Sequence, residues 1–386
     1  MALTINYTPP IYSSIHGDLI YTVADADKVA DPTTYANFKF IGDIYIGGNL
    51  IARLKRVPDP VTGIGVFNVA SIVRAYLSSA FNPTPGILIA QAFGEGEFYV
   101  NVDMHFGEEW NYTPVYNILG DTPRSFVNSY NGRFISGTSL LAANNQKVTS
   151  NRPTTGYAFL NSSFLFIPYF QYTGGAVSFS VAPSGGGSAF STSFTPTLVD
   201  MNLLNVSPIA LNALHAGCIT AATTSYAVTI GSQTYIIKLF CEPIYQPYTI
   251  HFLNQYGGFD SKIFSKVSRK TLEIERKDYG RLPYTVDGSG QVSYSSSNGI
   301  FNEERSTYSS LWKEKMSLNS DILTDEEYMW LQDLLLSPMI YLEDGGYFFP
   351  IVITDSNYEA KKVINDDLTS LVINIEFGKQ LNAQFR

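Results

Sequence analysis

The chain has 386 residues, of which 15% are charged, 14% are aromatic and 45% are hydrophobic. Soluble domains usually carry about 25% charged residues, so this chain is poor in charge and rich in Tyr and Phe. The hydrophobic content excludes a disordered chain. The net charge of −9 argues against a sequence-specific nucleic-acid-binding protein, which needs clustered Lys and Arg. We find no apolar run that could span a membrane and no secretion signal at the start of the chain.

Residues 1–120 predict an N-terminal β-sandwich with one helix. Residues 18–24, 36–46 and 49–57 are rich in β-branched and aromatic residues and are separated by turn signals such as Gly47-Gly48. Apolar residues recur at helical spacing over 69–81, and Asn68 precedes them as a candidate N-cap. We therefore expect a helix over one face of the sheet. Further strands are predicted at 87–93, 97–106 and 113–119.

Residues 121–243 predict a second, low-charge β domain. Only seven of the 130 residues from 111 to 240 are charged, and the cores of protein interfaces show the same depletion. We expect an insertion that partner subunits cover. Strands are predicted at 164–172, 176–182 and 190–197, a short helix at 207–215, and a hairpin at 226–230 and 234–241.

The two cysteines, Cys218 and Cys241, do not predict a disulfide framework. If Gly231-Ser232 forms a two-residue hairpin loop, Ile230 lies opposite Gln233 and the two cysteines do not face each other. We expect free, half-buried thiols.

Residues 244–386 predict a C-terminal β domain with a helix at 325–337 and an antiparallel meander. The helix has Thr324 and Glu327 at the spacing of a capping box. Residues 278–299 predict an exposed loop. Strands are predicted at 248–254, 261–268, 271–277 and 309–318, and the meander at 339–343, 347–354, 358–363 and 368–378. The whole chain is thus predicted to be mainly β, with two or more β-sandwich-like domains and two or three short helices.

The sequence predicts no catalytic, cofactor-binding or metal-binding residue. It has no phosphate-binding loop, no nucleophile elbow and no histidines at the spacing of metal ligands. Paired carboxylates could serve a glycosidase, but Glu95 and Glu97 fall in a predicted turn. Glu108 and Glu109 are adjacent and would point to opposite faces of a strand. We therefore expect a protein that is not an enzyme.

Three segments of the C-terminal third carry a resemblance to a known group of proteins. They are residues 248–258 (YTIHFLNQYGG), 328–338 (YMWLQDLLLSP) and 347–354 (YFFPIVIT), and a final strand follows at 371–377. Together with the strand-rich N-terminal block that leads into residues 69–81, this layout resembles virion proteins of tailed bacteriophages, especially phages of Bacteroidota. It is similar to that of tail-tube and distal-tail proteins, which implies a component of the tail, baseplate or head-to-tail connector.

From these observations we expect a non-enzymatic structural subunit of a phage virion, made in the cytoplasm of the bacterial host. It would form a homo-oligomeric ring of six- or twelve-fold symmetry through edge strands and aromatic contacts, and would bind other tail, baseplate or connector proteins without a cofactor. The alternative is a carbohydrate-binding or host-adhesion tail protein, with or without glycosidase activity. Trp110, Tyr112 and Tyr116 are the candidate glycan or partner contacts.

Overall fold

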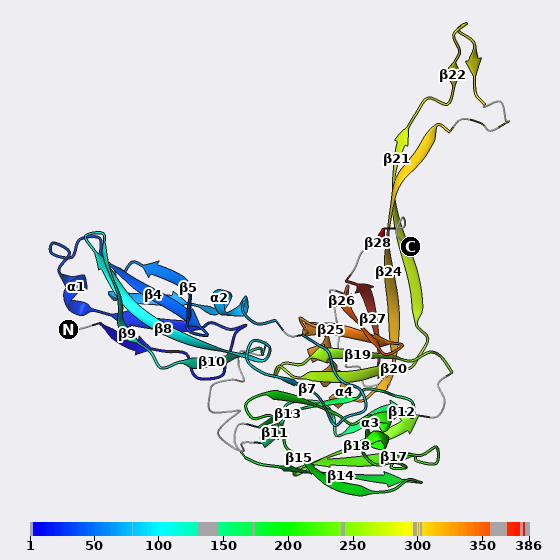
Figure 1. Cartoon of the computed structure of the whole chain (residues 1–386), viewed down its shortest axis with the longest axis horizontal. Helices are drawn as coiled ribbons and strands as arrows, with labels where there is room; N and C mark the ends of the chain where they lie inside the picture. The colour runs from blue at the N-terminus through cyan, green and yellow to red at the C-terminus, as the bar shows by residue number, and fades with distance from the viewer. Residues whose placement is uncertain are drawn as a thin grey trace. The chain divides into compact units, whose positions relative to one another are not determined.

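The computed structural model confirms a mainly β protein (Figure 1). It describes residues 3–78, 80–129, 146–171, 174–240, 244–295, 299, 301, 303–355, 369–378 and 381–382. Of these residues 53% lie in strands and 9% in four helices. The chain divides into two compact units. Unit 1 consists of Met1–Glu242, His251–Lys262 and Asp325–Pro338, and unit 2 of Pro243–Ile250, Ile263–Thr324 and Met339–Arg386. The boundaries predicted at residues 120 and 243 stay predictions.

The N-terminal part of unit 1 contains two sheets that share one core. The first has the order β1 (Thr4–Tyr7), β3 (Ile20–Ala24), β6 (Ile64–Asn68). The second has the order β2 (Ser13–Ser14), β10 (Arg124–Val127), β8 (Tyr99–Trp110), β4 (Lys39–Ile46), β5 (Asn49–Arg56), and β9 (Thr113–Gly120) pairs with β8. Tyr21 and Phe67 from the first sheet and Phe106 from the second are fully buried, with Phe106 about 6 Å from each. Apolar side chains from both sheets therefore form the core, as in a β-sandwich.

The predicted helix at 69–81 exists but is short. It comprises α2 (Ala70–Arg74), and its N-cap is Val69, although the Asn68 side chain still accepts a hydrogen bond from the Ala70 N–H at 3.1 Å. Ala70 and Val73 are buried, whereas Tyr76 is 43% exposed. The apolar stripe therefore packs on the core for about one turn, and packing rather than propensity sets the helix length. The structure also contains α1 (Ala26–Ala30), which we did not predict.

The middle of unit 1 is built from two further sheets. The four-stranded sheet has the order β11 (Gln146–Val148), β13 (Phe166–Gln171), β16 (Met201–Asn205), β7 (Ile89–Phe93). The five-stranded sheet has the order β12 (Thr155–Phe159), β18 (Gln233–Phe240), β17 (Ser225–Ile230), β14 (Val177–Ser184), β15 (Phe190–Phe194). The predicted hairpin register is confirmed, because Ile230 lies opposite Gln233 and Gly231 adopts the positive φ that such a loop needs.

The helix predicted at 207–215 is also confirmed. It is α3 (Pro208–Leu214), and the Ser207 hydroxyl accepts a hydrogen bond from the Ala210 N–H at 3.3 Å. Cys218 carries a free thiol that is fully buried rather than half-buried, and burial raises its pKa to about 11. Cys241 lies outside the described residues.

The C-terminal sheet has the order β20-β19-β25-β26-β27-β24-β21, with β28 paired to β24. Its strands are β19 (Tyr248–Leu253), β20 (Phe259–Phe264), β21 (Arg269–Gly280), β24 (Arg305–Leu323), β25 (Ile340–Asp344), β26 (Tyr347–Ile353), β27 (Thr369–Phe377) and β28 (Leu381–Asn382). The predicted helix at 325–337 is confirmed as α4 (Asp325–Leu336). The predicted meander strand at 358–363 lies outside the described residues.

The loop predicted at 278–299 is partly wrong. β21 continues to Gly280, and β22 (Thr285–Val286) pairs with β23 (Val292–Ser293). β24 begins at Arg305, earlier than the predicted strand at 309–318. β21 and β24 pair with each other over the whole length of β21, which extends both strands. The sequence does not predict this extension, because the Ser, Thr and Tyr residues of this region lack a clear alternation of polar and apolar side chains.

Candidate functional site

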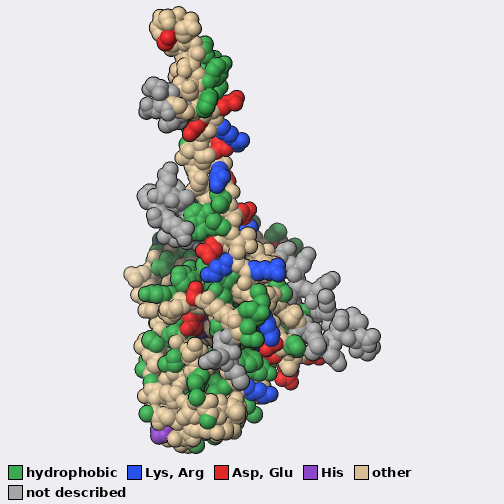
Figure 2. Space-filling model, turned by 90° about the vertical axis from the view of Figure 1, so that its right-hand side faces the viewer, with side chains coloured by type: hydrophobic (Ala, Val, Ile, Leu, Met, Phe, Trp, Pro, Cys, Tyr) green, Lys and Arg blue, Asp and Glu red, His purple; other side chains and the backbone are tan. Residues whose placement is uncertain are grey.

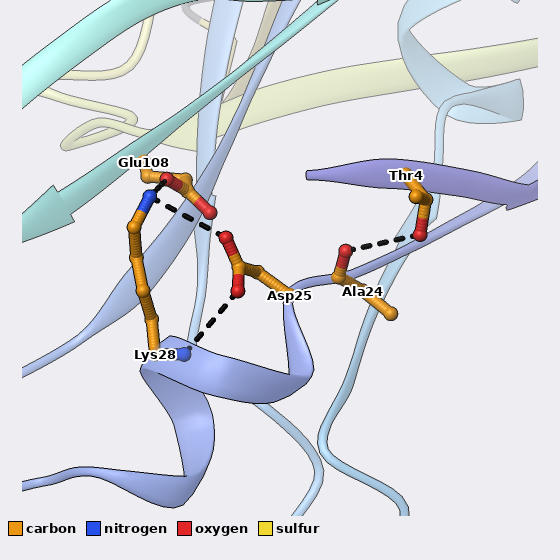
Figure 3. A network of polar contacts seen from close by, with 5 residues as sticks. All are labelled: Thr4, Ala24, Asp25, Lys28 and Glu108. Atoms are coloured by element: carbon orange, nitrogen blue, oxygen red, sulfur yellow. Dashed lines mark hydrogen bonds and ion pairs between the residues drawn. The ribbon is translucent and has the colours of Figure 1, made fainter. Parts of the chain in front are cut away.

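A buried acid–base network links α1 to β8 (Figure 3). Lys28 Nζ contacts Glu108 Oε2 and lies 3.4 Å from Asp25 Oδ2. The side chains of Asp25 and Glu108 are fully buried, and that of Lys28 is 23% exposed. Beside the network, the Thr4 hydroxyl donates a hydrogen bond to the Ala24 carbonyl at 3.2 Å and joins β1 to the end of β3. The two carboxyl groups and the single amine therefore lie together at the rim of the sandwich.

Local sequence explains how these groups meet. Asp25 is the N-cap of α1, and its Oδ1 accepts a hydrogen bond from the Lys28 N–H at 3.2 Å. The Lys28 side chain is one helical turn further on, which brings Nζ to the same carboxyl group. Inward positions in β8 alternate from Val100 to Phe106, and Glu108 is the next residue in this series. A glutamate thus occupies a core position.

Burial is the main reason why the pKa of Glu108 is raised, and the nearby charge of Asp25 adds to it, although Lys28 opposes both. Burial also disfavours the charged form of Lys28, but attraction to Glu108 and Asp25 outweighs it and raises the Lys28 pKa. The raised pKa values of Glu108 and Lys28 have one physical origin, because one cation faces two carboxyl groups that are buried away from water.

The three aromatic residues predicted as glycan or partner contacts do not form one platform. The ring of Trp110 packs edge-on against Tyr35 at 5.7 Å, and Lys28 Nζ lies 4.8 Å from its centre. The Arg53 guanidinium lies 3.6 Å from the centre of the Tyr116 ring. Tyr112 is 76% exposed. Of the three, therefore, only Tyr112 offers a largely uncovered ring, and the glycan site stays a prediction.

Glu109, Glu95 and Glu97 lie where the sequence predicts them, on the opposite face of β8 from Glu108 and in the turn before β8. Glu109 points away from Glu108 and forms ion pairs with Lys55 and, at 3.8 Å, with Lys39. Glu95 and Glu97 lie in the turn before β8, where the Phe98 N–H donates to the Gly94 carbonyl at 2.8 Å. Glu108 and Glu109 thus have different lysine partners on the two sides of β8, as the alternation along a strand predicts.

A second buried polar cluster surrounds Asp260 in β20. Asp260 Oδ2 accepts hydrogen bonds from Ser150 Oγ at 2.6 Å, Trp330 Nε1 at 2.9 Å and Asn254 Nδ2 at 3.2 Å. Asp333 follows Trp330 by one turn of α4. Burial, and then the charge of Asp260, raise the pKa of Asp333 to about 7. All these residues belong to unit 1, where the cluster attaches α4 and the β19–β20 turn to the segment around Ser150.

Unit 2 also contains a hairpin with exposed apolar side chains that we call the arm, defined as the described part of residues 276–310. Residues 305–310 of β24 pair with β21 and, among the described strands, with no other. In Figure 1 β21 and β24 run past the rest of their sheet toward β22. Seven arm side chains are between 48% and 76% exposed, namely Tyr279, Leu282, Val286, Val292, Tyr294, Phe301 and Tyr308.

Hydrophobic side chains gather along one side of the arm, as Figure 2 shows. Nearer the sheet, Leu272 and Ile274 of β21 are about half exposed and, with Trp312 of β24, line a surface hollow of 440 Å³. Sequence reasoning missed the arm, because its apolar residues are scattered through a segment rich in Ser, Gly and Tyr. It also missed Asp25 and Lys28, although an aspartate three residues before a lysine is a pattern that could have indicated a helix N-cap and an ion pair.

Comparison with protein-family models gives no match, and comparison with curated proteins gives no relative. No described helix is long and apolar enough to cross a membrane. Within the described ranges, no three His, Cys, Asp or Glu side chains are grouped closely enough to hold a metal ion.

Proposed function

We propose that the chain is a non-enzymatic structural subunit of a phage virion that assembles into a ring of the tail, baseplate or connector. The observation that carries this proposal is the arm. A two-stranded hairpin without further support is marginally stable in water, and contiguous exposed apolar surface is typical of interaction sites. A neighbouring copy that covers the seven apolar side chains of the arm would supply the missing burial.

The position of β21 supports assembly through strand edges. Among the described strands it is the last of its sheet; it has 12 residues, and all of them except Asp278 are exposed. An open edge of this length presents unpaired N–H and C=O groups to another chain. Its charged residues, Arg269 and Lys270 among them, would limit indiscriminate pairing and favour a partner with matching charges.

The carbohydrate-binding alternative has less support. Sugar rings stack on uncovered aromatic faces, and the rings of Trp110 and Tyr116 are occupied by contacts within the chain. Tyr112 can be tested on its own by glycan binding of a Tyr112→Ala variant.

The size of the purified full-length protein tests the proposed function. We expect a ring in electron micrographs and a mass of several subunits by light scattering. Replacing Leu282 and Phe301 together by Ser should yield monomers, because both side chains would lose their covering partner. The matched control is Val61→Ser, which removes a 90% exposed apolar side chain from the β5–β6 connection. A wild-type protein that stays monomeric at high concentration, or an arm variant that assembles normally, would refute the proposal.

A further inference from the structure

The buried network of Figure 3 contains the groups needed to form an amide bond between two side chains. We propose that Lys28 and Glu108 become joined by an isopeptide bond within the chain, with Asp25 as the catalytic acid–base. This modification site is independent of the proposed virion role, because it rests only on the chemistry of α1 and β8.

The first support is proximity. Lys28 Nζ contacts one oxygen of the Glu108 carboxyl group, so the nucleophile lies beside the carbon that it would attack. Asp25 Oδ2 is 3.4 Å from the same nitrogen, within reach of its protons. Well-oriented groups that are held together can reach effective concentrations of about 10⁵ M. Amide formation that is slow between free molecules becomes feasible under such conditions.

The second support is the state of the Glu108 carboxyl group. Its Oε1 is buried and accepts no hydrogen bond among the described residues. An unsatisfied buried oxygen is costly for a carboxylate but much less so for a neutral group. Asp25 and Glu108 both approach the Lys28 amine (Figure 3), and Asp25 contributes to the raised pKa of Glu108, which favours the protonated form of the Glu108 carboxyl group. A protonated carboxyl group, unlike a carboxylate, can be attacked by an amine.

The reaction balances without any co-reactant. The reaction starts from the Lys28 ammonium and two carboxylates. The ammonium first passes one proton to Glu108, which leaves a neutral amine, a protonated Glu108 and the Asp25 carboxylate. The Nζ lone pair then attacks Cδ of Glu108 and forms the C–N bond. Asp25 accepts the next proton from Nζ and delivers it to the Glu108 hydroxyl, which leaves as water when the C–O bond breaks. Asp25 ends in its starting state, and the products are one amide and one water molecule.

The surroundings favour the amide over its hydrolysis. Trp110 and Tyr35 lie on the Lys28 side of the network, with ring centres 4.8 and 6.0 Å from Nζ. Together with the burial of both carboxyl groups, they restrict the return of water. The bond would connect residues 80 positions apart in the chain and would restrict the unfolded state in the way a disulfide does.

The mass of the denatured full-length protein tests this proposal. The wild-type chain should be lighter than its sequence by one water molecule, and peptide mapping should yield a branched peptide that joins Lys28 to Glu108. Lys28→Arg keeps the positive charge but cannot form the amide, so this variant should have its full sequence mass. Asp25→Ser removes the acid–base group but keeps a good N-cap, and should also have its full mass.

The control variant is Lys55→Arg, because the Lys55–Glu109 ion pair is more exposed to water. This variant should still be lighter than its sequence by one water molecule. A wild-type protein with its full sequence mass after prolonged incubation in the folded state overturns the proposal. So does a mass deficit that persists in Lys28→Arg, or a branched peptide that does not contain Glu108. A deficit that survives in Asp25→Ser overturns the role of Asp25.

Discussion

Replacing Asp333 by Asn should change how the stability of unit 1 depends on pH. The Asp333 pKa is about 7 in the folded chain, against 3.8 for an unperturbed Asp carboxyl group, which represents the unfolded chain. Between these values the folded form holds a proton that the unfolded form has lost, so stability falls as pH rises. One proton corresponds to about 1.4 kcal/mol per pH unit, or about 4 kcal/mol over the whole window. The Asn side chain imitates the neutral acid and removes this contribution.

Urea unfolding at pH 5, 6 and 7 measures the effect. The slope of the unfolding free energy against pH should be more negative in the wild type than in Asp333→Asn by about 1.4 kcal/mol per unit. At pH 7 the variant should be more stable than the wild type. Glu326→Gln is the control, since Glu326 lies on the same helix but is exposed, and it should keep the wild-type slope. Equal slopes in Asp333→Asn and the wild type would refute the role assigned to Asp333.

Two further predictions concern packing. Gly107→Ala should destabilise the fold by about 1–3 kcal/mol, because its Cβ would lie 2.3 Å from the Val115 carbonyl oxygen of β9; Gly120→Ala, with its nearest neighbour at 3.5 Å, should cost much less in the same urea experiment. Cys218 should resist a thiol reagent at pH 8 in the folded protein and react in urea, since burial raises its pKa to about 11; mass mapping that finds equal labelling in both states would contradict this.

Local chemistry explains which parts of the fold the sequence predicts well. The turns at Gly47-Gly48 and Gly231-Ser232 and the Ser207-Pro208 helix start depend on residues that are neighbours in the chain. Elements whose form depends on tertiary packing were missed. All five residues of β16 are buried, so this strand shows no alternation. The five-residue helix α1 is too short for a periodic pattern.

The same distinction applies to the candidate site. The inward position of Glu108 can be read from the alternation along β8, but its partner Lys28 is 80 residues away in the chain. The shortage of charge in the middle segment has a partial explanation inside the fold. Asn202 and Asn205 are fully buried and use their side-chain amides to bond backbone groups, for example Asn205 with the Leu165 N–H at 3.1 Å. Neutral polar residues replace charged ones in such positions, because they can be satisfied without a counter-ion.

The division of the chain has a consequence for its synthesis. Unit 1 contains residues from the beginning of the chain and also the stretch Asp325–Pro338, which includes α4. Trp330 from this stretch donates to the buried Asp260, so the unit that begins first is completed late. Until the ribosome has synthesised the residues of α4, part of the apolar surface of the strands that α4 covers stays exposed. Apolar surface that is exposed in this way is prone to aggregation until α4 emerges and covers it.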